Sequence, residues 1–208
     1  FLLGFLEHSA SANSRFSLEH RLLNSHGAST PDLVERFAII PDVDYLDVSQ
    51  GSANERCERI REQGCDVLVD LSGWTGGHFQ HGLYARLAPL QLNYLGYFAS
   101  TFNPSMDGWV GDHHLFPDPV LESHTESIHR LGRCFLAWQP SDYFPEASAV
   151  IDEAGGASGE IRFGSFNHNR KLSDPTLRLW GVLLEQVPGA RLVLKANSSY
   201  DTGTSELL

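Results

Sequence analysis

Apolar residues at two different spacings divide the first third of the chain into short helices and strands. Residues 1–12 have the spacing of a helix, whereas apolar and polar residues alternate over 16–22 as in a strand. The elements predicted next are a helix over 31–37, a strand over 44–48, a helix over 53–63 and a strand over 66–70. Thr30 and Ser52 are suited to cap these two helices, and Gly64 is suited to end the second. This alternation predicts a doubly wound α/β layer.

The stretch from Asp66 to Leu95 predicts a complete strand-turn-helix-strand unit. Its parts are a strand over 66–70, a glycine-rich turn over 72–77, a helix over 79–87 and a strand over 90–95. The apolar run Val67-Leu68-Val69, which ends in Asp70, predicts a strand that is buried on both faces. Ligands of such units lie beyond the carboxyl ends of the strands, so the turn is the first candidate site.

After Leu95 the regular pattern weakens, and it returns only near the end of the chain. The elements predicted there are a loop over 96–105, a short strand over 108–111, a surface loop over 112–126, a strand over 161–166, a turn over 167–172, a helix from its N-cap Ser173 to about 187, and a strand over 191–194. Residues 147–159 are small, acidic and rich in glycine, as in a linker. We therefore predict a first domain over 1–150, a linker over 151–159 and a second domain over 160–208.

Several of these segments resemble one known family. The segments DVLVDLSGWTGG, ARLAPLQLNYLGY and MDGWVGD, followed by the run from Phe166 to Lys171, are similar to the catalytic region of the O-linked N-acetylglucosamine transferases, in a bacterial-type relative. The order and spacing agree over roughly Gln63 to Leu194. The resemblance implies a GT-B-like α/β fold, with one Rossmann-like parallel-sheet lobe and the beginning of a second. It also implies an inverting enzyme that transfers N-acetylglucosamine from UDP-GlcNAc to a Ser or Thr hydroxyl of a protein or peptide.

Composition limits the partners and the compartment. The formal net charge of −11 argues against nucleic acid or an anionic membrane surface as the main partner, because phosphate binding requires a basic face. No apolar run approaches the length of about 20 residues that spans a bilayer. The three cysteines lack C-x-x-C spacing, which favours a reducing, cytoplasmic compartment.

The histidines do not predict a metal site. His78 and His81 could form a ligand pair on one helix face, but no third ligand stands at a suitable spacing. His113 and His114 are adjacent and would point apart on a strand. We expect no metal ion and no cofactor, with UDP-GlcNAc acting as a substrate.

Four residues are candidates for binding the donor. Lys171 follows a predicted strand and precedes a helix start, which suits a diphosphate, and the resemblance implies the same role. The resemblance also places His168 toward the donor, while Ser72 and Thr75 could bind its sugar or phosphates through their hydroxyls. The alternatives are a solvated lysine, an exposed loop histidine and a turn that hydrogen-bonds to itself.

Other residues are expected to shape the site or to lie away from it. Asp70 could order the glycine turn or act in proton transfer, and the structural role is favoured. Gly73 and Gly76 are also interpreted as structural residues of the turn. Asp107 and Asp112 could form a catalytic carboxylate pair, but structural caps are the favoured interpretation.

The catalytic residue itself is not identified. The resemblance implies a histidine shortly before a helix similar to residues 1–8, which would lie upstream of Phe1, and further strand-helix units beyond Leu208. We therefore expect a piece truncated at both ends that is inactive alone. Phe79 stands where the family usually carries arginine. Two alternatives stay open: a non-catalytic nucleotide-sugar binding or scaffold domain, and a GT-B transferase with another donor or a glycan acceptor.

Overall fold

The chain forms two compact units, which we describe separately. The computed structural model describes residues 2–11, 17–27, 31–138, 161–167 and 171–195. The first unit comprises Phe1–Gln139 and the second comprises Pro140–Leu208. The predicted linker over 151–159 and the proposed cap Thr30 lie outside the described residues. None of the described helices is long and apolar enough to cross a membrane.

The first unit begins with two helices and a two-stranded parallel sheet. Its elements are α1 (Leu2–Ser11), β1 (His20–Asn24), α2 (Pro31–Ala38) and β2 (Val43–Asp47). The two strands pair in parallel from His20 opposite Val43 to Asn24 opposite Asp47. Leu6, Phe37, Ile40 and Val43 are buried together, so the apolar faces of both helices meet β2 in one core cluster.

The third helix has a local signal at each end. Helix α3 (Ala53–Arg61) begins at the N-cap Ser52, whose hydroxyl accepts the Glu55 N–H, while the Glu55 carboxylate accepts the Ser52 N–H. This reciprocal pair is a capping box. Gly64 then takes a positive φ of 61° and donates its N–H to the Arg61 carbonyl, which turns the chain toward the next strand.

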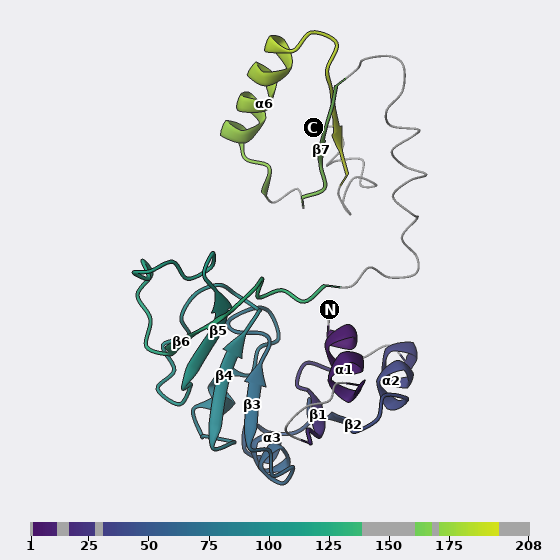
Figure 1. Ribbon diagram of the computed structural model, residues 1–208, viewed down its shortest axis with the longest axis vertical. Helices are drawn as coiled ribbons and strands as arrows, with labels where there is room; N and C mark the ends of the chain where they lie inside the picture. Colours follow the sequence, from purple (N-terminus) through teal and green to yellow (C-terminus); the bar gives the residue numbers. More distant parts are fainter. Residues whose placement is uncertain (1, 12–16, 28–30, 139–160, 168–170, 196–208) are drawn as a thin grey trace. The chain divides into compact units, whose positions relative to one another are not determined.

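A four-stranded parallel sheet follows, which lies beside the part of the first unit that contains β1, β2, α1 and α2 (Figure 1). Its order is β3 (Val67–Asp70), β4 (Leu90–Tyr94), β5 (Gly108–Asp112) and β6 (Ser127–Leu131). One face of the sheet shares a core with α3 and with α4 (Gln80–Leu83). The buried residues of this core are Val48, Cys57, Ile60, Phe79, Leu83, Leu87 and Met106, with Leu68 of β3 packed against them.

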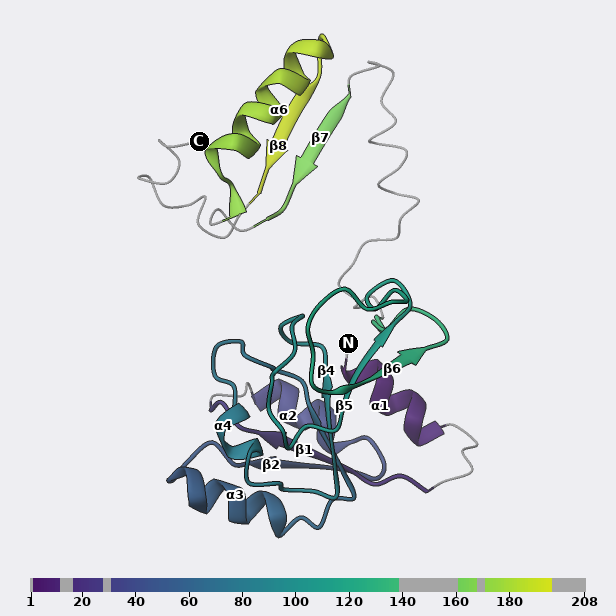
Figure 2. The ribbon, with the colours of Figure 1, turned by 90° about the vertical axis from the view of Figure 1, so that its left-hand side faces the viewer.

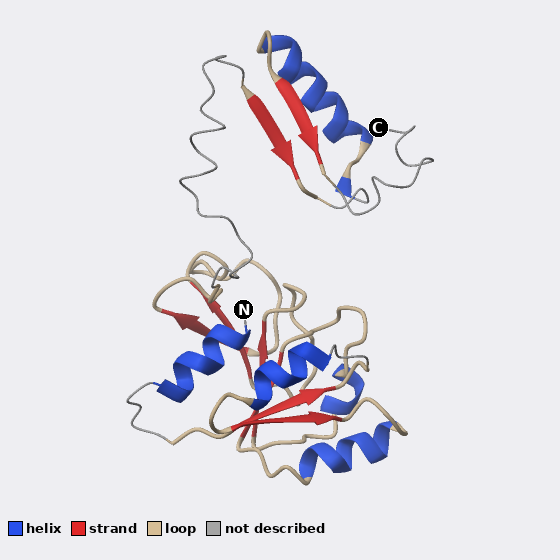
Figure 3. Ribbon diagram, turned by 90° about the vertical axis from the view of Figure 1, so that its right-hand side faces the viewer, coloured by secondary structure: helices blue, strands red, loops and turns tan. Residues whose placement is uncertain are grey.

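The second unit contains one strand-helix-strand unit. Strands β7 (Arg162–Ser165) and β8 (Arg191–Leu194) pair in parallel, and α6 (Asp174–Gln186) lies alongside them (Figures 2 and 3). The N-cap Ser173 accepts the N–H of Thr176, and a proline stands in the first turn of the helix. The α/β prediction with parallel sheets is therefore confirmed in both units.

Three predicted elements differ from the structure. The first strand spans His20–Asn24 rather than 16–22, because its pairing with β2 sets the register. The helix predicted over 79–87 contains only Gln80–Leu83, since Arg86 takes a left-handed φ of 51°. Strand β6 was not predicted, because its alternation of polar and apolar residues is weak and it depends on pairing with β5.

The prediction that the strand ending in Asp70 is buried on both faces is wrong. Strand β3 is the edge strand of its sheet, and the side chains of Val67 and Val69 are 48% and 44% exposed. Only the face carrying Leu68 packs against the described core. The apolar run therefore predicted the strand correctly, but it did not predict whether both faces of the strand are buried.

Candidate functional site

The glycine turn after β3 is held by the carboxylate that precedes it. Asp70 accepts the N–H groups of Ser72 at 3.3 Å and of Gly73 at 2.8 Å. Gly73 and Gly77 take positive φ values of 55° and 79°, which glycine adopts without a steric cost. Gly76 has open space around it, because no atom lies within 4 Å of the place that a Cβ would take. The Asp70 carboxylate and the glycines thus fix the conformation of the turn.

The hydroxyl of Thr75 hydrogen-bonds within the same turn. Thr75 donates its Oγ1–H to the Ser72 carbonyl at 2.8 Å and its N–H to the same oxygen at 3.2 Å. Both residues lie at the surface or half-buried. The turn that hydrogen-bonds to itself, one of the two alternatives for these residues, is thus present, while the Thr75 oxygen retains lone pairs that could accept a ligand hydroxyl.

The turn after β4 lies directly against the glycine turn. A Cβ on Gly96 would come within 2.5 Å of the carbonyl carbon and oxygen of Ser72, and a Cβ on Gly73 would come within 3.3 Å of the Tyr97 nitrogen. Leu95 and Gly96 both take left-handed conformations, with φ values of 63° and 65°. The two turns therefore touch through their backbones, which leaves no room for side chains.

Trp74 joins this contact to a small aromatic cluster. Its Nε1–H donates to the Thr101 carbonyl at 3.2 Å, and its ring meets His78 and His81 edge-on at centroid distances of 4.9 and 5.6 Å. The Gln80 N–H points to Nδ1 of His78 at 3.3 Å. Within the described ranges, no three His, Cys, Asp or Glu side chains lie close enough to hold a metal ion.

A buried polar network lies under the two turns. Gln80 donates to the Asp70 carboxylate at 2.6 Å and to the Asn93 carbonyl oxygen at 3.4 Å, and Asn93 donates to Glu126 at 2.9 Å. Gln80, Asn93 and Glu126 are at most 5% exposed. None of these three residues was predicted from the sequence. The only signal was the presence of Gln91 and Asn93 at alternating positions of an otherwise apolar strand.

Burial and hydrogen bonding have opposite effects on Glu126. Burial by itself would raise the pKa of its carboxyl group, but hydrogen bonds from Ser100 and Thr101 outweigh it and bring the pKa below its ordinary value. The ionised carboxylate is therefore the form that the fold accommodates.

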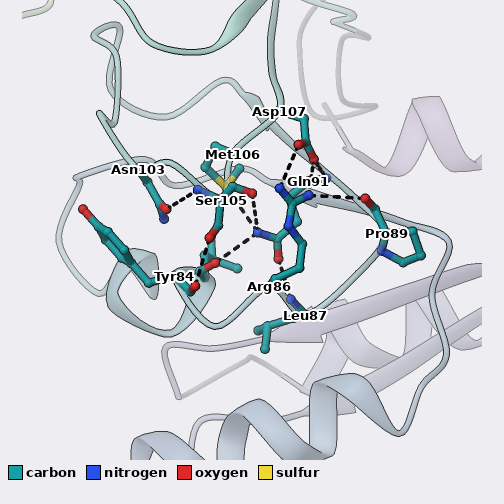
Figure 4. A network of polar contacts seen from close by, with 10 residues as sticks. Tyr84, Arg86, Leu87, Pro89, Gln91, Asn103, Ser105, Met106 and Asp107 are labelled. Atoms are coloured by element: carbon teal, nitrogen blue, oxygen red, sulfur yellow. Dashed lines mark hydrogen bonds and ion pairs between the residues drawn. The ribbon is translucent and has the colours of Figure 1, made fainter.

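A second polar network supports the opposite end of β4 (Figure 4). Gln91 is fully buried, and its amide group donates to the carbonyls of Leu83 and Ser105 while accepting the Leu87 N–H. Asp107 accepts a hydrogen bond from the Gln91 N–H at 2.8 Å. It also accepts hydrogen bonds from both terminal nitrogens of Arg86, at 2.5 and 2.9 Å.

Asp107 and Asp112, the two candidates for a catalytic carboxylate pair, make structural contacts. Asp107 accepts hydrogen bonds from Arg86 and from the Gln91 N–H, and the Arg86 hydrogen bond does most to lower the pKa of its carboxyl group. Asp112 accepts the N–H groups of His114, Leu115 and Phe135, of which the Leu115 bond does most to lower its pKa. These contacts are those of caps, which was the favoured interpretation.

Phe79 is part of the core rather than of a ligand-facing surface. Its side chain is 8% exposed, and the guanidinium of Arg56 lies 4.0 Å above its ring. Arg56 also donates to the carbonyls of Ser25 and Val48. The side chain of Phe79 therefore cannot form a charged contact with an anion.

The second unit carries the remaining candidates. Lys171 is exposed and lies two residues before Ser173, the N-cap of α6. His168 lies outside the described residues. A cavity in this unit is lined by Phe163, Gly164, Ser165, Trp180, Leu183, Leu184 and Leu192. Its lining is mostly apolar, and Lys171 is not part of it.

The chain is similar to known glycosyltransferases. No family model matches the chain. The probable UDP-N-acetylglucosamine–peptide N-acetylglucosaminyltransferases SPINDLY of rice and of Arabidopsis are each 35% identical over 136 residues. That alignment covers 65% of this chain, but only 14% and 15% of the two plant proteins. The probable enzyme SEC of Arabidopsis is 25% identical over 158 residues, which is 72% of this chain and 16% of that protein.

A solved structure agrees with these relatives. An O-GlcNAc transferase of Thermobaculum terrenum, in a lysine-to-methionine mutant, superimposes with a TM-score of 0.80 at 32% identity. The match covers 99% of this chain and 38% of the solved chain. The fold is therefore of the GT-B-like class, and the motif resemblance is confirmed. The chain belongs to the family of the O-linked N-acetylglucosamine transferases.

Proposed function

We propose that the protein containing this chain is an inverting glycosyltransferase that transfers N-acetylglucosamine from UDP-GlcNAc to a Ser or Thr hydroxyl of a protein or peptide. The observation that carries this proposal is the likeness to the Thermobaculum terrenum O-GlcNAc transferase, which extends over 99% of the chain at 32% identity. The names of the plant relatives support the same donor and the same class of acceptor. Because the chain spans about a seventh of those relatives, the activity belongs to the longer protein.

The leaving group defines what the site must do. When the acceptor oxygen attacks the anomeric carbon, the bond to UDP breaks and negative charge develops on the diphosphate. Lys171 and the positive end of the α6 helix dipole stabilise that charge, so that no metal ion is needed. Thr75, Ser72 and the N–H groups of the glycine turn bind polar atoms of the donor.

The compartment in this proposal is the cytoplasm. Cys57, Cys65 and Cys134 are all free thiols, and Cys134 is exposed. An exposed free thiol persists in a reducing environment, which supports this location.

A non-catalytic nucleotide-sugar binding domain is the second candidate, and a transferase with another donor or a glycan acceptor is the third. The observation that favours both is Phe79, whose buried phenyl ring stands where the family usually carries an arginine. A changed or weakened contact with the donor would follow from that difference.

Calorimetric titration with UDP separates these functions. The chain has one other lysine, Lys195, in the same unit, so Lys195→Ala is a matched control for Lys171→Ala. We expect Lys171→Ala to weaken UDP binding about tenfold or more, as for loss of a charge-assisted contact, and Lys195→Ala to leave it unchanged. Equal binding by all three proteins would reject the role of Lys171.

Turnover distinguishes an enzyme from a binder. Incubation of the full-length protein with UDP-GlcNAc and a peptide mixture should release UDP and add one N-acetylglucosamine to Ser- or Thr-containing peptides. UDP binding without transfer would favour the binding domain. Transfer to oligosaccharides alone would favour a glycan acceptor.

A further inference from the structure

Glu126 is a buried carboxylate held entirely by hydrogen bonds. It is 2% exposed and directly precedes β6. Its Oε1 accepts the Thr101 N–H at 2.8 Å, the Asn93 amide at 2.9 Å and the Thr101 hydroxyl. Its Oε2 accepts the Ser100 hydroxyl and the Thr125 N–H. Within the described ranges it forms no ion pair, so these donors alone stabilise its charge.

The segment that Glu126 holds has a strained backbone. Residues 95–103 connect β4 toward β5, and Leu95 and Phe102 take φ values of 63° and 50°. Such conformations cost a non-glycine residue about 1 kcal/mol or more and persist only where surrounding contacts impose them. Glu126 binds Ser100 and Thr101, immediately before Phe102. Its carboxylate is therefore well placed to impose the conformation.

The same segment contacts the glycine turn at two points. The Thr101 carbonyl accepts the Trp74 indole N–H, and Gly96 lies against the backbone of Ser72. A second route runs under the turn, where Asn93 links Glu126 to Gln80, and Gln80 reaches the Asp70 carboxylate. Glu126 is thus connected to the glycine turn by two routes, one through residues 95–103 and one through Asn93 and Gln80.

We propose that Glu126 is a positioning residue for the donor site: it holds residues 95–103 against the glycine turn 72–77 and thereby keeps that turn in the conformation that binds the donor. Its importance for the donor rests on the proposed function, but the contact between the two turns does not. Glu126 acts on the turn only through the residues between them.

The positioning role predicts local loosening of the two turns, whereas a general loss of stability would not be confined to them, so a control variant is needed. Asp107 provides the control, because it is also a carboxylate that precedes a strand of the same sheet and accepts a backbone N–H. Its partners are Arg86 and Gln91, which belong to the second network at the opposite end of β4 from the glycine turn. That network reaches residues 95–103 only at their end, where Ser105 bonds to Asn103 (Figure 4). Asp107→Asn should therefore lower stability without loosening residues 95–101.

The first measurement is hydrogen exchange of the full chain, for the wild type and for Glu126→Gln, Glu126→Ala and Asp107→Asn. We expect amides of 95–103 and 72–77 to exchange about tenfold faster in Glu126→Ala, since their local opening becomes easier. Glu126→Gln should show a smaller increase, because one oxygen still accepts hydrogen bonds. Asp107→Asn should leave residues 72–77 and 95–101 unchanged. If the Glu126 variants and Asp107→Asn show the same exchange in these segments, the proposal is rejected.

The second measurement is UDP affinity by calorimetry. We expect a fivefold to tenfold weaker affinity, on the order of 1 kcal/mol, in Glu126→Gln and no change in Asp107→Asn. Unchanged UDP affinity in a Glu126→Gln protein with faster exchange would also reject the positioning role. If the wild type binds no UDP, the proposed function fails, while the exchange measurement still decides whether Glu126 holds the two turns together.

Discussion

Gly96 lies so close to Ser72 that a single added carbon would overlap the backbone, at 2.5 Å from the Ser72 carbonyl carbon and oxygen. The two residues belong to the turns that follow β4 and β3, respectively. The absence of a side chain at residue 96 is thus what allows the two turns to meet at the candidate site.

Gly96→Ala should destabilise the first unit much more than Gly64→Ala. Both glycines have nearly the same φ, 65° and 61°, so both substitutions introduce the same backbone strain of about 1 kcal/mol. Only Gly96 also has a backbone clash, because nothing lies within 4 Å of a Cβ at Gly64. We expect a loss in the free energy of unfolding of about 3 kcal/mol for Gly96→Ala, measured by urea denaturation. Equal losses in the two variants would show that the turns can separate.

Asp107→Ala should destabilise the fold more than the loss of an exposed ion pair would. Asp107 accepts the N–H of the buried Gln91, and removing the carboxylate leaves that donor without its partner. We expect a loss of about 1–2 kcal/mol in the free energy of unfolding. Glu58→Ala removes the surface pair with Arg61 and should cost less than about 0.5 kcal/mol. A loss for Asp107→Ala no larger than for Glu58→Ala would contradict this account.

Stability should fall in acid, in part because of Asp107 and Glu126. The Arg86 hydrogen bond lowers the pKa of Asp107, and the hydrogen bonds to Glu126 lower its pKa despite burial. A carboxyl group whose pKa is lower in the folded state stabilises the fold above its unfolded pKa, near 4, and loses that contribution as the pH falls through its folded pKa.

The corresponding measurement is the melting temperature between pH 7 and pH 3. We expect little change from these two groups down to about pH 5, followed by a fall below it. Glu126→Gln should have a shallower fall than the wild type, because it lacks one of the groups that must bind a proton. An identical slope in the two proteins would show that Glu126 has the same pKa in the folded and unfolded states.

Gly181→Ala should stabilise the second unit. Gly181 lies inside α6, is exposed, and has no atom within 4 Å of a Cβ. Alanine has a higher helix propensity and restricts the unfolded chain, which should add about 0.5–1 kcal/mol. The matched substitution Gly82→Ala in α4 should destabilise, because its Cβ would come within 2.2 Å of the Phe79 ring. Unfolding followed by circular dichroism would report both signs.

The elements predicted correctly are those with local signals. Ser52 and Ser173 occur at the N-caps of α3 and α6, as expected, because a cap involves residues within one helical turn. Apart from β6, the order of strands and helices was recognisable from the spacing of apolar residues, and the family was recognisable from the glycine turn and from the run Phe166 to Lys171. These features depend on side chains that are near one another along the chain.

The features that were missed depend on contacts between distant residues. Strand β6 forms by pairing in parallel with β5, where Ile128 lies opposite Trp109. The residues of β6 alone do not require a strand. Val67 and Val69 are exposed because they point to the face of β3 opposite Leu68, which no described core cluster covers. A single apolar run cannot reveal which face of a strand is covered.

The candidate site shows the same division. The sequence by itself determined that a glycine turn follows Asp70 and that Lys171 precedes a helix. Only the tertiary structure decided that Glu126 lies beside Asn93 and Thr101, at sequence separations of 33 and 25 residues, and that Gly96 meets Ser72. Burial of an ionised carboxylate is favourable only when several donors converge on it, and that convergence exists only in the folded chain.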